Sequence, residues 1–527
     1  MNRHYVGVAA LAVALLVPSR AWADCKPRPL GNLLDGPIWN GWGVDSTNGR
    51  FQHAENARLR VDDIPRLKLK WAFGFDKATS GYAQPTVAGG RVFVGSQTGA
   101  VYSLDAATGC TFWTFRADAG VRNAMVIGPA RSAPSGYAVY FGDIQANVYA
   151  LDAASGKSVW KVEVDPHVQA RVTAAPTLVG DRLVIAVSSL EEVPAGAGTY
   201  ECCKFRGSVV SLDAGSGRQI WKSYTIPEEP RPIKKNAQGV TQWGPSGAAI
   251  WSAPTVDLKR QIIYVATGNA YSEPAAETTD SVLAFDLTTG KRVWARQLTP
   301  KDIFVVGCNA SGNSGAVNCA DAPGPDFDIG NSPILRSLPD GRQILVFGQK
   351  SGIAWGLDPD KQGEVLWQFR AGVGSALGGF EWGSAADDEN AYFPLSDFLV
   401  RPPANPGGLF AVRMATGEQV WHTPSPDVPC SLPRCNRAQA AAISVIPGAV
   451  FSGAMNGWFR AYDSKDGKII WEFDTGVAFQ TVNGVAAKGG SIDGPGPTIV
   501  DGMVFTNSGY SQFGGAPGNV LLAFGIE

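Results

Sequence analysis

The sequence has few of the residues and motifs on which many enzyme sites depend. It contains four histidines in 527 residues, so a histidine-rich metal centre or a Ser-His-Asp triad has little support. No Cys-x-x-Cys-His is present, which excludes a covalent haem c site in this sequence. No Gly-x-Gly-x-x-Gly opens a predicted helix, so a Rossmann nucleotide-binding unit is not expected.

Charge of one sign and long apolar runs are also scarce. The net charge is −2 and no basic patch stands out, so a nucleic-acid partner is not expected. One apolar run, residues 5–17, follows Arg3 and precedes Ala21-Trp22-Ala23. This pattern predicts a cleaved secretory signal over residues 1–23, a periplasmic location and no membrane span.

What the sequence does contain is a repeat that ends in tryptophan. Leu-Asp-Ala-Ala-Thr-Gly-Cys-Thr-Phe-Trp ends at Trp113, and Leu-Asp-Ala-Ala-Ser-Gly-Lys-Ser-Val-Trp ends at Trp160. The frame Asp-x-x-x-Gly-x-x-x-Trp, with small departures, returns at Trp221, Trp294, Trp367, Trp421 and Trp471. Self-similarity at this period indicates a solenoid or a propeller.

Each repeat is expected to form one four-stranded antiparallel blade. Short β-branched and aromatic runs, such as residues 85–87, 92–94 and 101–104, alternate with turns rich in Gly and Asp. The Trp is expected to lie between neighbouring blades, with a hydrogen-bond partner for its indole N–H.

The eighth repeat is split between the two ends of the sequence. Residues 67–73 supply a Trp strand, with Trp71, and residues 497–524 supply strands without one. Joining them closes a ring and leaves no exposed sheet edge. The sequence therefore predicts an all-β, eight-bladed propeller over residues 67–527, preceded by an N-terminal arm over residues 24–66.

The eight cysteines agree with export to an oxidising compartment. Two local pairs, Cys308–Cys319 and Cys430–Cys435, would close short loops. Cys25 would then pair with Cys110, and Cys202 with its neighbour Cys203. The alternative is that Cys202 and Cys203 each bond a distant partner.

The docking phrase resembles that of the quinoprotein alcohol dehydrogenases, eight-bladed propellers that hold pyrroloquinoline quinone (PQQ). The segments 39–43, 188–192 and 200–207 are similar to the polyvinyl alcohol dehydrogenase branch. The resemblance implies oxidation of alcohols, secondary ones in particular, to ketones, with polyvinyl alcohol as a candidate substrate. Members of that branch often carry a haem c domain. Because no Cys-x-x-Cys-His is present here, electrons are expected to pass to a separate soluble cytochrome c.

The resemblance also implies a metal site and a base. Glu192, with Glu191 as its rival, Asn269 and Asp326 match the family's Ca²⁺ ligands. Asp326 is the expected catalytic base, and Asp328 is the expected second catalytic carboxylate or additional metal ligand. The added carboxylate leaves a lanthanide open as the alternative ion.

Further residues are implied as contacts to PQQ. Lys350 matches the cation at the quinone oxygens, and Trp251 the aromatic floor. The other expected contacts are Thr173, Ser189, Cys202, Cys203, Arg206 and Trp382.

These residue types suit the chemistry apart from the resemblance. PQQ is a flat, tri-anionic orthoquinone, which needs an aromatic floor, cations and a bridging metal. Ca²⁺ prefers oxygen ligands from Glu, Asn and Asp, and it acts as a Lewis acid. A carboxylate base can take the hydroxyl proton of an alcohol as hydride leaves the carbon.

Structural interpretations remain open for each residue and for the chain. Asp326 and Asp328 lie among Gly and Pro, where Asp often bonds its local backbone. The chain as a whole could be a non-catalytic scaffold, or a polymer-binding propeller that uses Trp382, Phe380 and Tyr510. An enzyme requires the candidate side chains to converge at one mouth of the ring.

Overall fold

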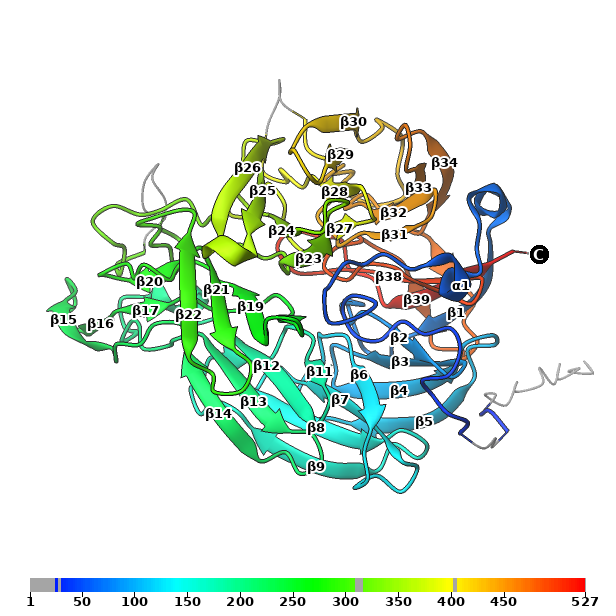
Figure 1. Cartoon of the computed structure of the whole chain (residues 1–527), viewed down its shortest axis with the longest axis horizontal. Helices are drawn as coiled ribbons and strands as arrows, with labels where there is room; N and C mark the ends of the chain where they lie inside the picture. Colours follow the sequence, from blue (N-terminus) through cyan, green and yellow to red (C-terminus); the bar gives the residue numbers. More distant parts are fainter. Residues whose placement is uncertain (1–23, 27–29, 309–315, 401–404, 527) are drawn as a thin grey trace, which may run out of the picture.

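Eight antiparallel sheets, seven of four strands and one of five, form a ring in the computed structural model, which describes residues 24–26, 30–308, 316–400 and 405–526 (Figure 1). The predicted signal segment, residues 1–23, lies outside the described residues. Each sheet is one blade, and the blades follow one another around the ring in chain order, which confirms the predicted propeller. No helix of the described residues is both long and apolar enough to cross a membrane.

The first four blades are numbered here in chain order. Blade 1 comprises β2 (Thr86–Ala88), β3 (Arg91–Gly95), β4 (Ala100–Asp105) and β5 (Thr111–Arg116). Blade 2 comprises β6 (Val126–Pro129), β7 (Tyr137–Gly142), β8 (Asn147–Asp152) and β9 (Ser158–Glu163). Blade 3 comprises β11 (Thr177–Val179), β12 (Arg182–Ser189), β13 (Ser208–Asp213) and β14 (Gln219–Tyr224), with β10 (Ala170–Arg171) paired to β12. Blade 4 comprises β18 (Thr255–Asp257), β19 (Ile262–Ala266), β21 (Ser281–Asp286) and β22 (Arg292–Gln297).

Three further blades continue the ring. Blade 5 comprises β23 (Ile334–Ser337), β24 (Gln343–Gly348), β25 (Ile353–Asp358) and β26 (Glu364–Arg370), with the 3₁₀ turn η2 (Pro359–Lys361). Blade 6 comprises β27 (Ala385–Ala386), β28 (Asn390–Pro394), β29 (Leu409–Arg413) and β30 (Gln419–Thr423). Blade 7 comprises β31 (Ser444–Ile446), β32 (Ala449–Gly453), β33 (Trp458–Asp463) and β34 (Ile469–Asp474).

Blade 8 is built from both ends of the chain, as the sequence predicts. Its strands are β37 (Thr498–Val500), β38 (Met503–Ser508), β39 (Val520–Gly525) and β1 (Lys68–Gly74). β1 pairs with β39 from Lys68 opposite Gly525 to Gly74 opposite Val520. Figure 1 shows the blue N-terminal strand beside the red C-terminal strands. This pairing closes the ring and covers the sheet edge that β39 would otherwise expose.

The docking tryptophans lie between neighbouring blades. A Cβ added to Gly156 of blade 2 would come within 2.6 Å of the ring of Trp113 from blade 1, so the glycine rests on that ring. Six docking tryptophans also donate their indole N–H to a backbone carbonyl of the following blade. The pairs are Trp71–Ala106, Trp113–Ala153, Trp160–Ala214, Trp367–Met414, Trp421–Ser464 and Trp471–Leu67. The repeat therefore joins the blades by both apolar contact and hydrogen bonds.

The N-terminal arm crosses one end of the ring and bonds to successive blades. It contains the short helix α1 (Ala54–Ala57) and the 3₁₀ segment η1 (Val61–Arg66). Backbone hydrogen bonds link it to the first strands of several blades, in the pairs Trp39–Val87, Ser46–Val256, Thr47–Leu335, Gly49–Ala386 and Gln52–Val445. Arg50 is fully buried in the arm, and its guanidinium stacks 4.6 Å from the ring of Trp42. The arm thus joins the first strands of blades 1, 4, 5, 6 and 7 by backbone hydrogen bonds.

All four disulfides match the predicted pairs. Cys25 bonds Cys110, Cys202 bonds Cys203, Cys308 bonds Cys319, and Cys430 bonds Cys435. The first ties the arm to blade 1, and Cys202 and Cys203 have no distant partner.

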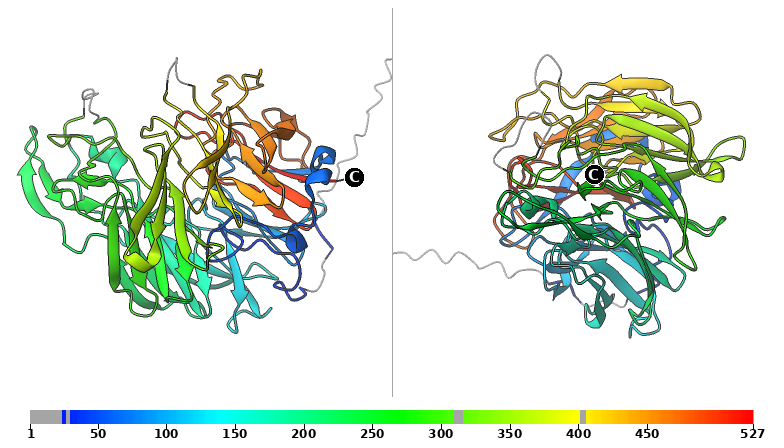
Figure 2. Two further views of the ribbon diagram at one scale, coloured as in Figure 1. Left: turned by 45° about the horizontal axis from the view of Figure 1, so that its top comes forward. Right: turned by 90° about the vertical axis from the view of Figure 1, so that its left-hand side faces the viewer.

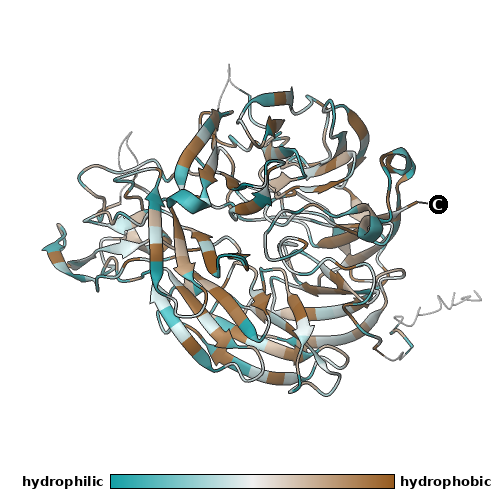
Figure 3. Cartoon of the chain, viewed as in Figure 1, coloured by the Kyte–Doolittle hydropathy of each residue, from teal (hydrophilic) through white to brown (hydrophobic). Residues whose placement is uncertain are grey.

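Three two-stranded sheets lie outside the eight blades. They are β15 (Arg231–Lys235) with β16 (Thr241–Gly244), β17 (Ser246–Gly247) with β20 (Ala270–Ser272), and β35 (Ala478–Phe479) with β36 (Ala487–Lys488). The β15–β16 hairpin projects from the ring in Figures 1 and 2. Buried apolar residues form clusters within and between the blades. In Figure 3, many hydrophilic segments lie in turns and outer strands. The longest connections between blade strands lie between blade 3 and blade 5. A loop of blade 3 contains the short helix α2 (Glu192–Ala195), which follows β12.

Candidate functional site

Loops from several blades converge on one cavity. Its volume is about 270 Å³. The predicted site residues that line it are Thr173, Ser189, Glu192, Trp251, Asp326, Asp328, Lys350 and Trp382. They come from the loops before the first strand of a blade, from the end of its second strand or from the loop after it, which a propeller places on the same face. The convergence required of an enzyme is therefore present.

Lys350 lies at the centre of the charged wall of the cavity. Its Nζ donates to both carboxylate oxygens of Asp326 at 3.2 Å and to Oδ2 of Asp328 at 3.0 Å. All three side chains are buried. Two carboxylates share one ammonium, and Glu192 adds a third carboxyl group, so the wall would carry an excess of negative charge if all of these groups were ionised.

Burial and crowding shift the titration of this cluster. Desolvation, followed by repulsion from Asp328 and Glu192, raises the pKa of Asp326 despite the attraction of Lys350. Desolvation opposes the charge on Lys350, but its carboxylate neighbours outweigh this and raise its pKa. Desolvation, with Asp328 nearby, raises the pKa of Glu192 to about 7. A cation added to this wall would relieve the repulsion.

Asp328 connects the charged wall to the aromatic floor. Its Oδ2 accepts the indole N–H of Trp251 at 3.2 Å, and its Oδ1 accepts the backbone N–H of Asn269 at 2.8 Å. Trp251 contacts Trp382 edge to face, with ring centroids 4.9 Å apart. A Cβ added to Gly330 would lie 1.9 Å from the ring of Trp251, so only glycine permits this ring position.

Asn269 is oriented by its own amide group. Its Nδ2 donates to the carbonyls of Ala270 at 2.7 Å and Phe304 at 2.8 Å. Both donor hydrogens are thus used, which leaves Oδ1 as the acceptor available to a cation. Asn269 does not itself line the cavity, but it adjoins Asp328 beside the cavity wall.

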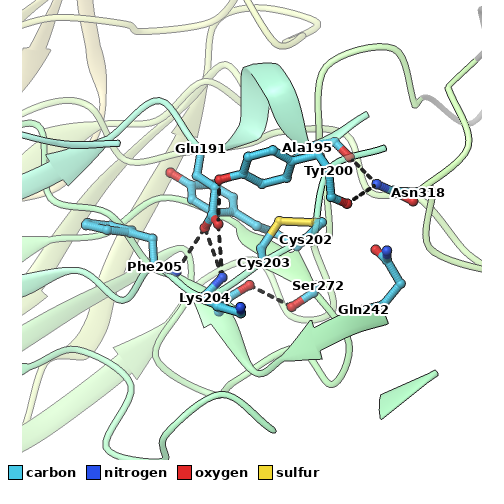
Figure 4. Close-up of a disulfide and its surroundings, with 12 residues drawn as sticks. Glu191, Ala195, Tyr200, Cys202, Cys203, Lys204, Phe205, Gln242, Ser272 and Asn318 are labelled. Atoms are coloured by element: carbon cyan, nitrogen blue, oxygen red, sulfur yellow. Dashed lines mark hydrogen bonds between the residues drawn. A yellow bond between two sulfur atoms is a disulfide. The ribbon is translucent and has the colours of Figure 1, made fainter. Parts of the chain in front are cut away.

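The structure distinguishes between Glu191 and Glu192. Glu191 is buried, and its carboxylate accepts hydrogen bonds from the hydroxyl of Tyr200 and the backbone N–H groups of Lys204 and Phe205 (Figure 4). Glu192, at the first position of α2, lines the cavity instead. Of the two, Glu192 is therefore the one placed to reach a guest in the cavity.

Three predicted cofactor contacts lie away from the cavity wall. The Cys202–Cys203 disulfide is buried in an apolar cluster that also contains Phe205 and Tyr271, and Figure 4 shows the disulfide near Phe205. The guanidinium of Arg206 lies 3.9 Å from the ring of Tyr224 and donates to backbone carbonyls on the outer side of the blade. None of these three side chains lines this cavity, and their contact with PQQ stays a prediction.

Other residues of the site carried no recognisable signal in the sequence. Arg122 lines the cavity, donates to the hydroxyl of Tyr510 at 2.9 Å and stacks 4.4 Å from the ring of Trp382. Asp302 accepts hydrogen bonds from the backbone of the Asp326 loop. Asp280 is fully buried, and neither of its carboxyl oxygens has a hydrogen-bond partner among the described residues. Their positions depend on long-range contacts between loops, which no local motif records.

The cavity residues fit a planar anionic cofactor with a metal. Trp251 offers a ring face, Lys350 and Arg122 supply cations, and the buried hydroxyl of Thr173 has no hydrogen-bond partner in the described structure. The described residues contain no preformed group of three His, Cys, Asp or Glu side chains suited to a metal. The candidate ligand set instead combines an amide with carboxylates, and Lys350 holds two of these carboxylates. Hard oxygen donors of this kind match Ca²⁺ and similar ions.

Two family models match the sequence. Residues 39–313 match the PQQ model, described as the glucose/ethanol/alcohol dehydrogenase β-propeller domain. Residues 206–445 match the model of the outer membrane protein assembly factor BamB. The second match reflects the shared propeller repeat and covers less than half of the chain.

Curated relatives are similar over nearly the whole chain. A polyvinylalcohol dehydrogenase of Pseudomonas sp. is 45% identical, over 95% of this chain and 79% of the relative. A polyvinylalcohol dehydrogenase of Sphingopyxis sp. (strain 113P3) is 44% identical, over 93% of this chain and 76% of the relative.

Solved structures agree on the fold. The quinohemoprotein alcohol dehydrogenase of Comamonas testosteroni superposes with a TM-score of 0.66 and 19% identity, over 93% of this chain and 80% of that one. A europium-containing methanol dehydrogenase gives a TM-score of 0.66 at 18% identity, over 93% of this chain and 98% of that one.

The polymer-binding alternative loses two of its aromatic residues, because Phe380 and Tyr510 are fully buried. The scaffold alternative does not account for the buried charged groups that meet in the cavity, and extensive identity to dehydrogenases decides between the hypotheses. Members of the matched family depend on PQQ and a metal ion. This chain belongs to the PQQ-dependent quinoprotein alcohol dehydrogenase family and is an oxidoreductase of that type.

Proposed function

We propose that this enzyme oxidises secondary alcohols to ketones in the periplasm, with PQQ and Ca²⁺, and passes electrons to a soluble cytochrome c. The observation that carries the proposal is the meeting of Lys350, Asp326, Asp328 and Glu192 above Trp251 in one cavity. Four disulfides support export to an oxidising compartment. The N-terminal pattern of residues 1–23 supports secretion.

The proposed roles follow from position and charge. Glu192, Asn269 and Asp326 would hold Ca²⁺ through oxygen atoms, and Asp328 adds a carboxylate for an ion of higher charge. Trp251 would lie against the ring of PQQ, and Lys350 would face its oxygens. Thr173 and Ser189 would bond the polar edge, while Trp382 would border the substrate side.

The bound cofactor with its metal supplies an electrophilic quinone that accepts hydride. Asp326 takes the hydroxyl proton of the alcohol, and Lys350, 3.2 Å away, stabilises the carboxylate that performs this step. The buried walls exclude water and strengthen both interactions.

An apolar rim supports a long or polymeric alcohol as substrate. Val306, Leu399 and Phe513 line the cavity while remaining 46%, 52% and 44% exposed. Methylene groups on either side of a reacting carbinol would bury apolar surface against this rim, at about 25 cal/mol per Å². Polyvinyl alcohol, the substrate in the names of the two similar relatives, has this alternation of hydroxyls and methylenes.

Reconstitution tests the proposal directly. The purified protein is loaded with PQQ and Ca²⁺, and dye reduction is followed with polyvinyl alcohol, short secondary alcohols and primary alcohols. Preferred oxidation of secondary alcohols is expected, and no bound quinone with no dye reduction would refute the proposal.

A variant pair assigns the base. Asp326→Asn is expected to lower turnover at least about a thousandfold while PQQ still binds. Asp340→Asn, on an exposed turn, is the matched control and should match wild type. Full activity in Asp326→Asn would place the base elsewhere.

A further inference from the structure

Two buried carboxyl groups lie beside the cavity without a role in the proposed chemistry. Glu381 and Asp493 are 6% and 7% exposed. Among the described residues, no hydrogen bond or ion pair joins the Glu381 carboxyl to another group. Asp493 Oδ1 is buried without a hydrogen-bond partner. Burying a carboxyl group whose hydrogen bonding is incomplete is costly, which calls for an explanation.

Glu381 borders two cavities at once. It lines the catalytic cavity and also a much smaller one of about 10 Å³, which Asp493 and Ser396 line as well. This volume is close to that needed for one water molecule, and the carboxyls supply the polar partners that a buried water requires. A water there would bridge Glu381 towards Asp493.

The small cavity adjoins a third one on its far side. Phe398 and Met455 line both the small cavity and an outer cavity of about 420 Å³. The outer cavity is bordered by Arg434 and Ser511 and shares none of its lining residues with the catalytic cavity. Glu381 and Asp493 therefore lie between the site of chemistry and a second region of the surface.

The charges around the pair favour proton exchange near neutral pH. Desolvation, then Asp493, raises the pKa of Glu381 to about 8, against the attraction of Lys350 and Arg122, and Asp328 adds a small repulsion. Desolvation raises the pKa of Asp493 to about 6, while the Trp382 indole, Arg122 and the backbone N–H of Gly494 lower it. Groups that titrate close to the working pH transfer protons most effectively.

The reaction needs such an exit. Oxidation of a secondary alcohol, R₂CHOH, to R₂C=O yields two electrons and two protons once an external one-electron acceptor has taken the electrons. Both protons must leave the buried wall around Asp326. A long alcohol seated on the rim of Val306, Leu399 and Phe513 would cover the direct way to solvent.

We propose that Glu381 and Asp493 form a proton-release path from the catalytic cavity, through a bridging water, to the outer cavity. Glu381 takes a proton from water in the catalytic cavity and passes one to the bridging water. Asp493 takes a proton from the bridging water and passes one to water that enters from the outer cavity. Each transfer breaks one O–H bond and forms another, so no further reactant is needed. The inference rests on the proposed function and adds to it the route by which protons leave.

Comparison of single-turnover and steady-state rates distinguishes this role from a structural one. In Glu381→Gln, single-turnover oxidation of a secondary alcohol without acceptor should stay within about twofold of wild type, since the first proton goes to Asp326. Steady-state turnover with excess acceptor should fall at least about tenfold, with a larger solvent deuterium isotope effect. Asp493→Asn should show the same pattern, and Glu381→Asp should recover part of the rate. The control is Glu364→Gln, an exposed carboxylate on β26.

If Glu381→Gln lowered the single-turnover rate and the steady-state rate equally, the proposed path would be wrong. An unchanged steady-state rate with an unchanged isotope effect would also contradict it. Infrared spectroscopy of the protein without cofactor gives a second readout. Wild type should show a carboxylic acid band that titrates near pH 8 and is missing in Glu381→Gln; the same band in both proteins contradicts the proposal. The infrared band tests whether Glu381 carries a proton in the folded protein, even if the reconstituted wild type oxidises no alcohol. Absence of alcohol oxidation would separately refute the proposed function.

Discussion

Asp302 holds the backbone of Asp326 in a left-handed conformation. The Asp302 carboxylate accepts the N–H of Asp326 at 3.1 Å and that of Phe327 at 2.6 Å. Asp326 has a φ of 64°, in the left-handed region that residues other than glycine adopt infrequently, although Asp enters it more readily than most. Asp302 is therefore a positioning residue for the proposed base.

Removing this support should impair chemistry more than binding. Asp302→Ala leaves two backbone donors without their acceptor and lets the Asp326 loop relax, so turnover is expected to fall about a hundredfold. Asp302→Asn keeps one acceptor oxygen, so its turnover should lie between those of wild type and Asp302→Ala. Stopped-flow turnover and fluorescence titration with PQQ measure the two effects. Loss of PQQ affinity equal to the loss of turnover would show that Asp302 supports the whole cavity instead.

The second carboxylate at Lys350 should set the preference between ions. Asp328→Asn removes a negative charge next to the proposed metal site but keeps an oxygen that can accept the N–H of Asn269. Affinity for La³⁺ should then fall about tenfold more than affinity for Ca²⁺, because the loss of attraction scales with the charge of the ion. Calorimetric titration of both ions in the presence of PQQ measures this ratio. An unchanged ratio would mean that Asp328 does not contact the ion.

Much of the fold was predictable because its rules are local. The Asp-Gly-Trp frame contains a turn former, a positive-φ glycine and a large docking ring, and these determine each blade within a few residues. Ring closure followed from counting Trp strands. The crossing of the arm beneath the ring was not predictable, because the bonds from Thr47 to Leu335 and from Gln52 to Val445 join distant segments.

Site residues were predictable where they lie at or just after the end of a strand and match a motif of the family. Lys350 after β24 and Ser189 at the end of β12 are of this kind, and both line the cavity. Arg206 does not line this cavity, since its guanidinium lies against the ring of Tyr224, and its contact with PQQ stays a prediction. Arg122 and Glu381 were missed, because an isolated charged residue in a loop has no periodicity that reveals its burial.

Docking between blades should tolerate no side chain on the docking glycine. Gly417 has a φ of 76°, and an added Cβ would lie 2.8 Å from the ring of Trp367. Gly417→Ala is therefore expected to lower the free energy of unfolding by about 1–3 kcal/mol more than a control with strain alone. Gly341→Ala is that control, because Gly341 has a φ of 84° with no atom within 4 Å of its added Cβ. If urea unfolding gave the same loss of unfolding free energy for Gly417→Ala and Gly341→Ala, the contact with Trp367 would accommodate the extra methyl group.

The buried guanidinium of the arm should be essential for stability. Arg50 donates to the carbonyls of Ile443 and Trp42 and to Gln84 Oε1 without a carboxylate partner in the described structure. Arg50→Met leaves these acceptors buried and unpaired, at a cost of about 3 kcal/mol or more. Arg58→Met, at an exposed pair with Asp501, should cost under about 1 kcal/mol. Similar values for the two variants in urea unfolding would contradict a structural role for Arg50.

Stability of the protein without cofactor should fall as pH rises through the titration range of Glu381. Burial raises its pKa from 4.5 to about 8, so the folded protein keeps a proton that the unfolded chain has lost. The stabilisation is complete below pH 4.5 and disappears as pH rises towards 8, with a slope of at most about 1.4 kcal/mol per unit for one proton. Glu381→Gln removes this group, and its unfolding free energy should depend less on pH than that of wild type. Urea titrations at pH 5, 6.5 and 8 measure the difference, with Glu364→Gln as control. Parallel curves for wild type and Glu381→Gln would mean that Glu381 is ionised in the folded protein, and the neutral, proton-carrying form of this carboxyl would then be absent at the pH of turnover.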